Sequence, residues 1–387
     1  MIPLSLPNLA GKEWEYVKQC LDTGWISTAG GFVDRFESEF KTYLGVNGAV
    51  SVVNGTAALH VSLQLLGVKG DDLVIMPNVT FVASANAIKY VGAEPVLIDI
   101  DKDTWQMDLQ ILESFLKNSC NLDQNGSLIH RDSKRKISAL MIVHVQGNMC
   151  DMDRLLKICS NYRLPVLEDA AEALGSMYKG QYAGTLGDIG CFSFNGNKIM
   201  STGGGGMIVS QSIEYVQRAK HLSTTAKRDS LSYFHDEVGY NYRLVNVLAA
   251  IGVAQLEQLG SFVASKVTTA EYYKTNLADV GDIEFQVVKD NVISNQWLFT
   301  IKTQLMVELL QYLNANGVMS RPFWIPMNQL PMFSSCLYIA NSDISSYVHD
   351  RALSLPCSTS ISQKELVEVV TKIRSFFDDE VNYATNI

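Results

Sequence analysis

Apolar and polar residues alternate along the first half of this chain in a way that predicts an α/β fold. Between residues 50 and 209, short runs of β-branched and apolar residues are followed by longer segments with apolar residues three and four positions apart. The short runs predict strands at Ala49–Val53, Leu73–Met76, Pro95–Ile98, Ser138–Val143, Pro165–Glu168, Gly190–Phe194 and Met207–Val209. The longer segments predict helices at Thr56–Leu66, Ala83–Val91, Leu109–Asn118 and Met152–Tyr162. Crossovers of this length favour a mostly parallel sheet between helices, with ligands at the carboxyl ends of the strands.

Further segments lie on either side of this sheet. Lys12–Leu21 and Val33–Leu44 are amphipathic, and a loop with several glycines separates them. Apolar residues near helical spacing predict a long helix from Leu244 to about Leu259. The remaining chain has a mixed α/β pattern. We therefore expect a large domain with an N-terminal helical arm over residues 1–260 and a smaller α/β domain over residues 261–387.

The composition is that of an ordered globular protein. Of the 387 residues, 47% are hydrophobic and 18% are charged, and this length suggests two or three domains. The formal net charge is -9 without a basic stripe, so we do not expect a nucleic-acid partner. The polar segment 118–136 carries a basic cluster, and we interpret this segment as a solvated surface loop.

No membrane, metal or disulfide signature stands out in the sequence. The most apolar stretches are much shorter than the roughly 20 residues that a helix needs to cross a bilayer. Residues 1–9 lack the charged and apolar regions of a secretory signal. The 7 cysteines are scattered, without a CxxC pair or clustered histidines, so we expect neither disulfides nor a metal site. We expect a cytoplasmic protein.

The most informative stretch is GCFSFNGNKIMSTGGGGMIV, residues 190–209. A predicted strand ends in polar residues and is followed by Lys198, four glycines and another strand. Burial beside Ile199 and Met200 would lower the pKa of this lysine and make its neutral amine available as a nucleophile. Taken alone, however, the stretch also describes an ordinary surface lysine beside a flexible turn.

A carboxylate at a second strand end changes this interpretation. VLEDAAEALGS, residues 166–176, places Asp169 at the carboxyl end of a predicted buried strand. Pyridoxal 5'-phosphate (PLP) requires a lysine for its aldehyde and a carboxylate that keeps its pyridine nitrogen protonated. Asp169 and Lys198 supply that pair. Without the lysine, Asp169 is equally well explained as the N-cap of a helix.

A third motif predicts a phosphate site. In SVVNGTAALHVSL, residues 51–63, Gly55 lets a phosphate approach the backbone at a helix start, and Thr56 adds a hydroxyl donor. Ser193 offers a further donor from another strand. The alternative interpretations are an ordinary capped turn and a plain strand serine.

Two more side chains follow predicted strand ends. Phe81 lies where an aromatic ring would stack on a planar cofactor, although core packing is the default for a phenylalanine. His144, in VHVQGN, is one of only 6 histidines, and without metal-like spacing we interpret it as structural or as supporting a neighbouring site residue.

Six ordered blocks together resemble one known family. The blocks are NGTAAL, PNVTFVASANAI, VHVQGN, EDAAEALGS, FSFNGNK followed by TGGGG, and GYNYRLVNVLAAIGVAQLEQL. They are similar to the DegT-type nucleotide-sugar aminotransferases, which are fold-type-I PLP enzymes with a large and a small α/β domain. The resemblance covers about residues 24–259 and continues more weakly to residue 356.

The resemblance implies a role for each matching residue. Lys198 corresponds to the PLP-bound lysine and proton shuttle, and Asp169 to the partner of the pyridine nitrogen. Glu172 stands where many members have Gln near the 3-hydroxyl of the ring. Asn241 matches an asparagine that reaches the phosphate in the neighbouring subunit, which implies a homodimer with shared active sites. The implied cofactor contacts are Gly55, Thr56, Phe81, Asp169, Glu172, Ser193, Lys198 and Asn241.

The substrate side of the site is less clearly marked. GVMSRPFWIPMNQLP, residues 317–331, differs from the His-Tyr pattern common in the family and looks like the branch that aminates UDP-linked 4-keto-6-deoxy-N-acetylhexosamine. Arg321 suits a diphosphate or the carboxylate of the amino donor, and Trp324 a wall for the sugar or base. An exposed arginine above a packed tryptophan explains these two residues equally well. Further substrate candidates are Trp25, Ser27, Thr28 and His144.

Lys198 favours transamination, because family members with histidine at this position are dehydratases. The resemblance implies amino transfer from glutamate to UDP-2-acetamido-2,6-dideoxy-hexos-4-ulose. One alternative is another nucleotide keto-sugar, namely GDP-4-keto-6-deoxymannose or a dTDP-linked 3-keto- or 4-keto-6-deoxyhexose. Others are a dehydratase, an amino-acid lyase and a non-catalytic regulatory PLP protein.

Overall fold

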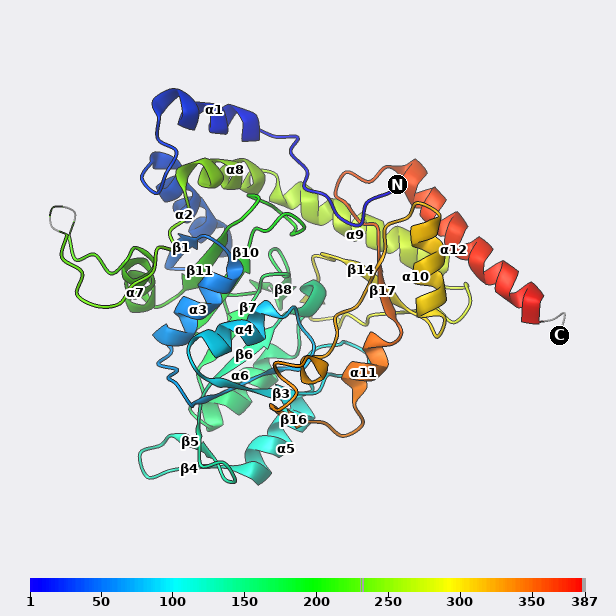
Figure 1. The fold of residues 1–387 in the computed structure, drawn as a ribbon. Helices are drawn as coiled ribbons and strands as arrows, with labels where there is room; N and C mark the ends of the chain where they lie inside the picture. Colours follow the sequence, from blue (N-terminus) through cyan, green and yellow to red (C-terminus); the bar gives the residue numbers. More distant parts are fainter. Residues whose placement is uncertain (230, 232, 385–387) are drawn as a thin grey trace.

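The core of the molecule is a large sheet in which neighbouring strands are mostly parallel (Figure 1). The computed structural model describes residues 1–229, 231 and 233–384. The strands lie in the order β1 (Gly48–Val52), β11 (Gly206–Ser210), β10 (Ile189–Ser193), β7 (Val166–Asp169), β6 (Lys136–Val143), β2 (Leu73–Pro77), β3 (Glu94–Ile98) and β16 (Leu337–Ile339). From β10 to β16 every neighbour is parallel, whereas β11 runs antiparallel to β1 and β10.

Helices cover both faces of this sheet because its strands are apolar on both sides. Along β6, Leu140 and Ile142 enter one hydrophobic cluster, whereas Ala139 and Met141 enter another. The first cluster also contains residues of α2 (Gly31–Leu44), α5 (Leu109–Ser119), α6 (Met152–Asn161) and α8 (Asn246–Leu256). The second contains residues of α3 (Gly55–Leu65), α4 (Ala83–Tyr90) and α7 (Ile213–Ser223).

Short polar side chains set where several of these helices begin. Asn54, Asp108, Asp151 and Ser212 each accept a hydrogen bond from a backbone N–H in the first turn of α3, α5, α6 and α7. Each capping residue follows a strand or the loop after that strand, so polar side chains lie where the chain passes from a strand into a helix. This arrangement positions the site described below.

The periodicity predicted the core well. The strands predicted between residues 49 and 209 and the helices predicted up to residue 162, including α1 (Glu13–Thr23) and α2, are confirmed with ends shifted by no more than two residues. The α/β fold class is likewise confirmed.

One prediction was wrong. Segment 118–136 is not a loop: β4 (Cys120–Leu122) and β5 (Leu128–His130) form a hairpin that extends the sheet beside β6. The helix predicted from Leu244 to about Leu259 is confirmed as α8, and a further helix, α9 (Leu259–Leu277), follows it after a bend of 60°. Among the described residues, no helix alone has the length and apolarity to span a membrane, although α8 and α9 meet that test when taken together.

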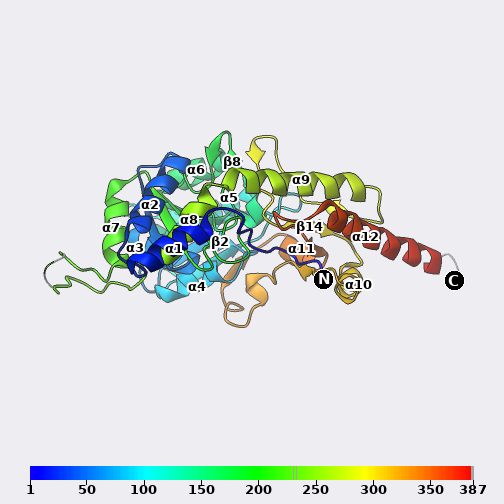
Figure 2. The same ribbon diagram turned by 90° about the horizontal axis from the view of Figure 1, so that it is seen from above.

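The C-terminal part builds a smaller sheet next to the large one (Figures 1 and 2). Its order is β12 (Glu284–Phe285), β14 (Phe299–Lys302), β17 (Ala352–Leu355) and β15 (Arg321–Pro322). The helices of this region are α10 (Met306–Ala315), α11 (Ile344–His349) and α12 (Gln363–Ala384). Strand β13 (Val292–Ile293) joins β8 (Met177–Tyr178) and β9 (Gln181–Tyr182) in a third sheet, and β16 returns to the edge of the large one. A boundary at residue 260 stays a prediction.

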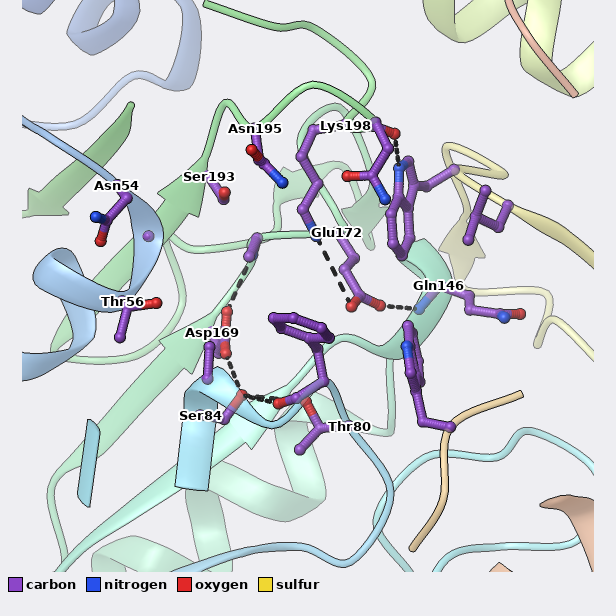
Figure 3. A pocket seen from close by; sticks show the side chains of 18 of the residues that line it. Asn54, Thr56, Thr80, Ser84, Gln146, Asp169, Glu172, Ser193, Asn195 and Lys198 are labelled. Atoms are coloured by element: carbon purple, nitrogen blue, oxygen red, sulfur yellow. Dashed lines mark hydrogen bonds and ion pairs between the residues drawn. The ribbon is translucent and has the colours of Figure 1, made fainter. Parts of the chain in front are cut away.

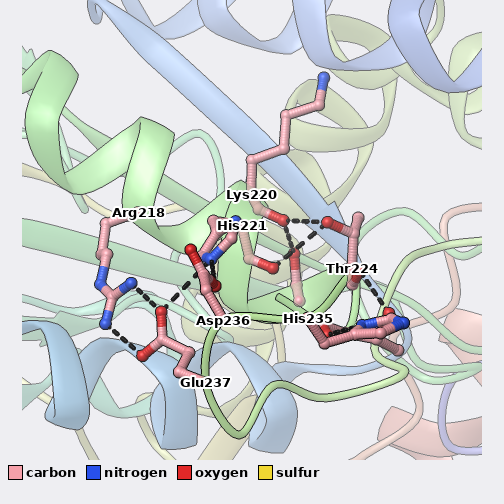
Figure 4. Close-up of polar contacts among 9 residues, drawn as sticks. Arg218, Lys220, His221, Thr224, His235, Asp236 and Glu237 are labelled. Carbon is pink, nitrogen blue, oxygen red and sulfur yellow. Dashed lines mark hydrogen bonds and ion pairs between the residues drawn. The ribbon is translucent and has the colours of Figure 1, made fainter. Parts of the chain in front are cut away.

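An arm formed by the described residues 224–229, 231 and 233–240 projects from the body beyond α7 (Figures 1 and 2). Ion pairs hold its base: Arg218 binds Glu237, and His221 Nε2 lies 2.7 Å from Asp236 Oδ1 (Figure 4). Exposed apolar side chains on the arm are Leu231, Tyr233, Phe234 and Val238. Apolar groups held this far from the core are a surface suited to contact with another chain.

Candidate active site

A cavity of about 440 Å³ opens at the carboxyl ends of β7 and β10 (Figure 3). The start of α3 forms one wall, and β15 of the small sheet contributes to the opposite side. The charged side chains among its lining residues are Asp169, Glu172, Lys198 and Arg321. The cavity therefore lies where a parallel α/β sheet is expected to bind ligands.

The backbone around Lys198 is held by a turn and by apolar anchors. Its N–H donates to the carbonyl oxygen of Asn195 at 3.0 Å. The next two residues, Ile199 and Met200, are buried in the core. The lysine is thereby fixed at the end of a tight loop after β10, with its side chain 11% exposed and directed toward the carboxylates (Figure 3).

Burial and two carboxylates oppose each other at the lysine amine. Burial lowers the pKa of Lys198, while Glu172 and Asp169 raise it in part. Nζ lies 3.9 Å from Oε1 of Glu172 and 4.1 Å from the ring centre of Trp297. A lysine in such surroundings has a larger neutral fraction at a given pH than an exposed lysine, as a nucleophile requires.

Asp169 is the last residue of β7, and its carboxylate is held by two donors. Ser84 Oγ donates to Oδ2 at 2.7 Å, and the Ala171 N–H donates to Oδ1 at 3.2 Å. Burial raises the pKa of Asp169, and these two hydrogen bonds work against that rise. The residues after it form turns, so the interpretation of Asp169 as a helix N-cap is wrong.

Glu172 approaches the lysine from the loop after β7. Its Oε2 accepts the backbone N–H of Gln146 at 2.8 Å. Burial raises the pKa of Glu172 to about 7, although Lys198 and this hydrogen bond lower it. Gln146 has a left-handed backbone with φ 57°, and its side chain donates to Thr300 Oγ1 at 2.7 Å. The small sheet thus helps to fix the orientation of Glu172.

A cup of donors forms the far end of the cavity. Gly55 and Thr56 begin α3, whose first N–H groups have no partner within the helix. A Cβ on Gly55 would lie 2.9 Å from the Cβ of Ser193, so only glycine permits this close approach. The hydroxyls of Thr56 and Ser193 line the same space (Figure 3). This donor set suits a phosphate group.

The remaining walls are aromatic and basic. Phe81, which is 53% exposed, lines the cavity just before α4. Arg321 lies in β15 opposite Ser354, and Trp324 stacks on Trp297 with ring centres 6.2 Å apart. All five residues line the cavity, so a planar group and an anionic group both find matching surfaces there.

The structure does not bring every predicted residue into this cavity. His144 is fully buried and is not among the lining residues; its Nε2 forms a hydrogen bond of 2.8 Å with Oε2 of Glu168. This arrangement fits its interpretation as a structural histidine. Trp25, Ser27, Thr28 and Asn241 lie elsewhere on the chain surface or beside α8, outside the cavity lining.

Several lining residues were missed in the sequence. Thr80, Ser84, Gln146 and Asn195 lie inside the quoted blocks, a few positions from residues that were singled out. Their position after strand ends was the available signal. Trp297 follows Lys198 by about a hundred residues, and no local pattern connects the two.

This fold and cavity define a class of enzyme that works through a lysine and an aldehyde cofactor. The chain belongs to the DegT/DnrJ/EryC1/StrS aminotransferase family, whose model matches residues 7–374. It is 37% identical to a GDP-perosamine synthase of Escherichia coli O157:H7 over 382 residues, which are 98% of this chain and 99% of that protein. It is 35% identical to the GDP-perosamine synthase of Vibrio cholerae over 385 residues, covering 98% and 100%.

Solved structures give the same picture for the fold. The protein Spr1654 of Streptococcus pneumoniae, in its PMP-form, aligns with a TM-score of 0.88 and 24% identity over 98% of this chain and 100% of that chain. The protein described here is a PLP-dependent sugar aminotransferase, which confirms the predicted activity class and cofactor. The named relatives do not support the predicted UDP-hexosamine branch, and they favour the GDP-sugar alternative.

The residues present fit this cofactor. PLP, when bound, supplies an aldehyde that condenses with amines and a ring that withdraws electrons from the reacting carbon. The close approach of Gly55 to Ser193 excludes a side chain at residue 55, so the start of α3 presents bare backbone beside two hydroxyl donors, as a phosphate requires. A buried carboxylate, Asp169, and a desolvated lysine, Lys198, match the charge and the reactivity that the cofactor demands.

Proposed function

We propose that this protein transfers an amino group from glutamate to the keto group of GDP-4-keto-6-deoxymannose, in a homodimer with shared sites. The observation that carries the choice of sugar is the similarity to GDP-perosamine synthases at 35–37% identity over 98% of this chain. A UDP-linked sugar is the first competing substrate.

Lys198 is the group that moves protons in this proposal. Its Nζ removes a proton from the α-carbon of the amino donor and later delivers one to the carbon that carries the new sugar amine. The lowered pKa supports the first of these roles, because the amine must be neutral to accept a proton.

Asp169 and the cup hold the cofactor in the proposal. Asp169, oriented by Ser84, would face the protonated ring nitrogen, and its negative charge stabilises the charge that develops on the ring. The N–H groups at the start of α3, with Thr56 and Ser193, would hold the phosphate. Phe81 would cover one face of the ring.

Arg321 and Trp324 are the proposed substrate contacts from this chain. Arg321 is exposed and lines the cavity, and its guanidinium suits the carboxylate of glutamate or the diphosphate of the nucleotide. Trp324 would form a wall for the sugar or the guanine base.

A second subunit would complete the site. Asn241 is exposed at the base of the arm and outside this chain's own cavity, where the family pattern expects a residue that serves the neighbouring subunit. The exposed apolar side chains of the arm support such a contact. Trp25, Ser27 and Thr28 remain candidates for the same shared surface.

The test is a substrate panel. We would incubate the PLP-loaded protein with glutamate and GDP-, UDP- or dTDP-linked keto-sugars, and measure amino-sugar and 2-oxoglutarate by mass spectrometry. We expect the highest kcat/KM for GDP-4-keto-6-deoxymannose and no product from the Lys198→Ala variant. Preference for a UDP-linked sugar would contradict the choice of nucleotide, and glutamate consumption without any amino-sugar would contradict the function.

A further inference from the structure

The amine of Lys198 lies over the flat face of a tryptophan. Its Nζ is 4.1 Å from the ring centre of Trp297, well inside the roughly 6 Å within which a cation is attracted to an aromatic face. Trp297 is only 3% exposed, so little water screens this attraction. The carboxylate of Glu172 lies 3.9 Å from the same amine.

Hydrogen bonds hold both the indole ring and the backbone of Trp297. Its indole Nε1–H donates to the carbonyl oxygen of Asn197 at 2.7 Å, and its backbone N–H donates to Asn295 Oδ1 at 2.9 Å. Its carbonyl oxygen accepts from Lys266 Nζ at 2.8 Å. Because Asn197 immediately precedes Lys198, the first of these bonds ties the ring to the loop that carries the lysine.

Glu172 is fixed as well. Oε2 is held by the N–H of Gln146, which leaves Oε1 as the oxygen nearest to the lysine. Gln146 in turn is held by Thr300 of β14. The carboxylate and the ring therefore come from separate parts of the chain and meet at one point in the cavity.

We propose that Trp297 and Glu172 form a receiving site for the ammonium of Lys198, which they hold whenever this amine is not covalently bonded. In each cycle the amine must leave the cofactor and return. While the amine is free, the fixed aromatic face and the fixed carboxylate hold it close to the reacting carbon and keep the lysine side chain from turning toward solvent. This inference rests on the proposed role of Lys198 and not on the identity of the sugar.

The electrostatics of the cavity agree with such a site. Burial lowers the pKa of Lys198, and an amine that was only desolvated would give up its proton too readily to return one. Glu172, Asp169 and the face of Trp297 work in the opposite sense, while Arg321 is the other cation among the lining residues. The receiving site therefore opposes the effect of burial and favours the protonated form of the amine.

The test measures how fast Lys198 reacts with acetic anhydride as the pH changes. Only the neutral amine is acetylated, and peptide mass spectrometry reports the extent at this one lysine. We would use the full-length protein twice, once without cofactor and once loaded with pyridoxamine phosphate. In Trp297→Phe and Glu172→Gln, Lys198 should react about threefold to tenfold faster than in wild type near pH 7 to 8.

The pH profile separates this effect from simple access. Once the pH is high enough to deprotonate Lys198 in every variant, the rates should converge. A difference that persists unchanged at high pH would show that the variants only open the cavity, and it would overturn the proposal. Trp14→Phe is the matched control, because Trp14 is an exposed tryptophan of α1 outside the cavity lining, and the rate of this variant near pH 7 should equal that of wild type.

A change that keeps the shape of the ring gives a sharper test. Growth on 5-fluorotryptophan replaces all 5 tryptophans and weakens the negative face of each ring. Lys198 in the fluorinated protein should react about twofold faster near pH 7. The same fluorination of the Trp297→Phe protein should change nothing.

Equal rates in the fluorinated and unfluorinated wild-type proteins would overturn the role of Trp297. The cofactor-free measurement keeps this outcome separate from failure of the proposed function. If the protein transfers no amino group, the labelling result still shows whether the receiving site exists.

Discussion

The Nζ atom of Lys198 lies 3.9 Å from Oε1 of Glu172, and both groups are almost entirely buried. Glu172 is therefore a second titratable group beside the lysine. Its pKa of about 7 puts the change of charge within the physiological range. Several measurable consequences follow from this pair and from the groups around it.

The stability of the cofactor-free protein should depend on pH through Glu172. The folded protein keeps the Glu172 proton up to about pH 7, whereas the unfolded chain releases it near the ordinary value of 4.5. The folded state therefore binds more protons in this range, and its stability falls as the pH rises from 4.5 to 7. The loss amounts to at most about 3 kcal/mol.

Glu172→Gln removes this titration and supplies the comparison. Urea unfolding at pH 5 and pH 8 should show wild type losing more stability than Glu172→Gln between the two pH values. Parallel losses in the two proteins would contradict the raised pKa of Glu172.

Asp169→Asn should leave the fold intact and remove most of the catalysis. The amide still accepts from Ser84, but it cannot hold a proton on the ring nitrogen. We expect the release of 2-oxoglutarate from glutamate to slow by on the order of a hundredfold or more in single-turnover measurements.

The rate loss in Ser84→Ala is the comparison for the rate loss in Asp169→Asn. The Ser84→Ala variant removes one hydrogen bond from the Asp169 carboxylate and leaves its charge, so the loss should be about tenfold. An Asp169→Asn rate within threefold of wild type would show that the carboxylate is not needed.

The donor cup should determine how tightly the cofactor is held. Thr56→Ala and Ser193→Ala each remove one hydroxyl donor from the proposed phosphate site. Each should weaken PLP binding about tenfold, measured by equilibrium dialysis in the presence of Lys198→Ala so that the covalent bond does not mask the change. Thr268→Ala, on the exposed face of α9, is the control and should bind as wild type does.

Asn241 should act in the site of the other subunit. Lys198→Ala and Asn241→Ala proteins should each have little activity alone, because every site lacks one residue. After unfolding and refolding together in equal amounts, mixed dimers contain one intact site, and activity should return to about a quarter of the wild-type value. No recovery, with mixed dimers present by native mass spectrometry, would place Asn241 in its own chain's site or outside both.

The large sheet was predictable because each of its elements carries its own local pattern. Strand β6 is a run of apolar residues that feeds both hydrophobic clusters, and α6 has an Asp151 cap and one buried face. Such signals are complete within about ten residues. The hairpin β4–β5 was missed because each strand has only three residues and is defined by pairing, β4 with β5 and β5 with β6.

Helix α9 and the return of β16 were missed for a similar reason. Helix α9 buries Lys266 and Thr269 beside its apolar residues, so apolar spacing alone does not mark its buried face. Strand β16 is exposed at one end and joins the sheet through β3, far away in the sequence.

The candidate site shows the same difference between residues marked by a local pattern and contacts that depend on tertiary packing. Lys198 and Asp169 were predicted because Asp169 ends β7 and Lys198 lies in the loop after β10, and a parallel sheet brings such strand ends together. The contact between Trp297 and Lys198 depends on how the small sheet lies against the large one, which no local pattern encodes. The sequence pattern did not identify the sugar substrate correctly. Residues 317–331 suggested a UDP-linked sugar, whereas the similarity to GDP-perosamine synthases favours a GDP-linked sugar.

The central claim is that Lys198 carries the cofactor and releases it when glutamate arrives. The direct measurement is borohydride reduction of the PLP-loaded protein followed by peptide mapping, with and without prior exposure to glutamate. We predict a cofactor adduct on Lys198 that disappears after glutamate, with an equal amount of 2-oxoglutarate formed. An adduct on another lysine, or no adduct in the presence of excess cofactor, would contradict the account.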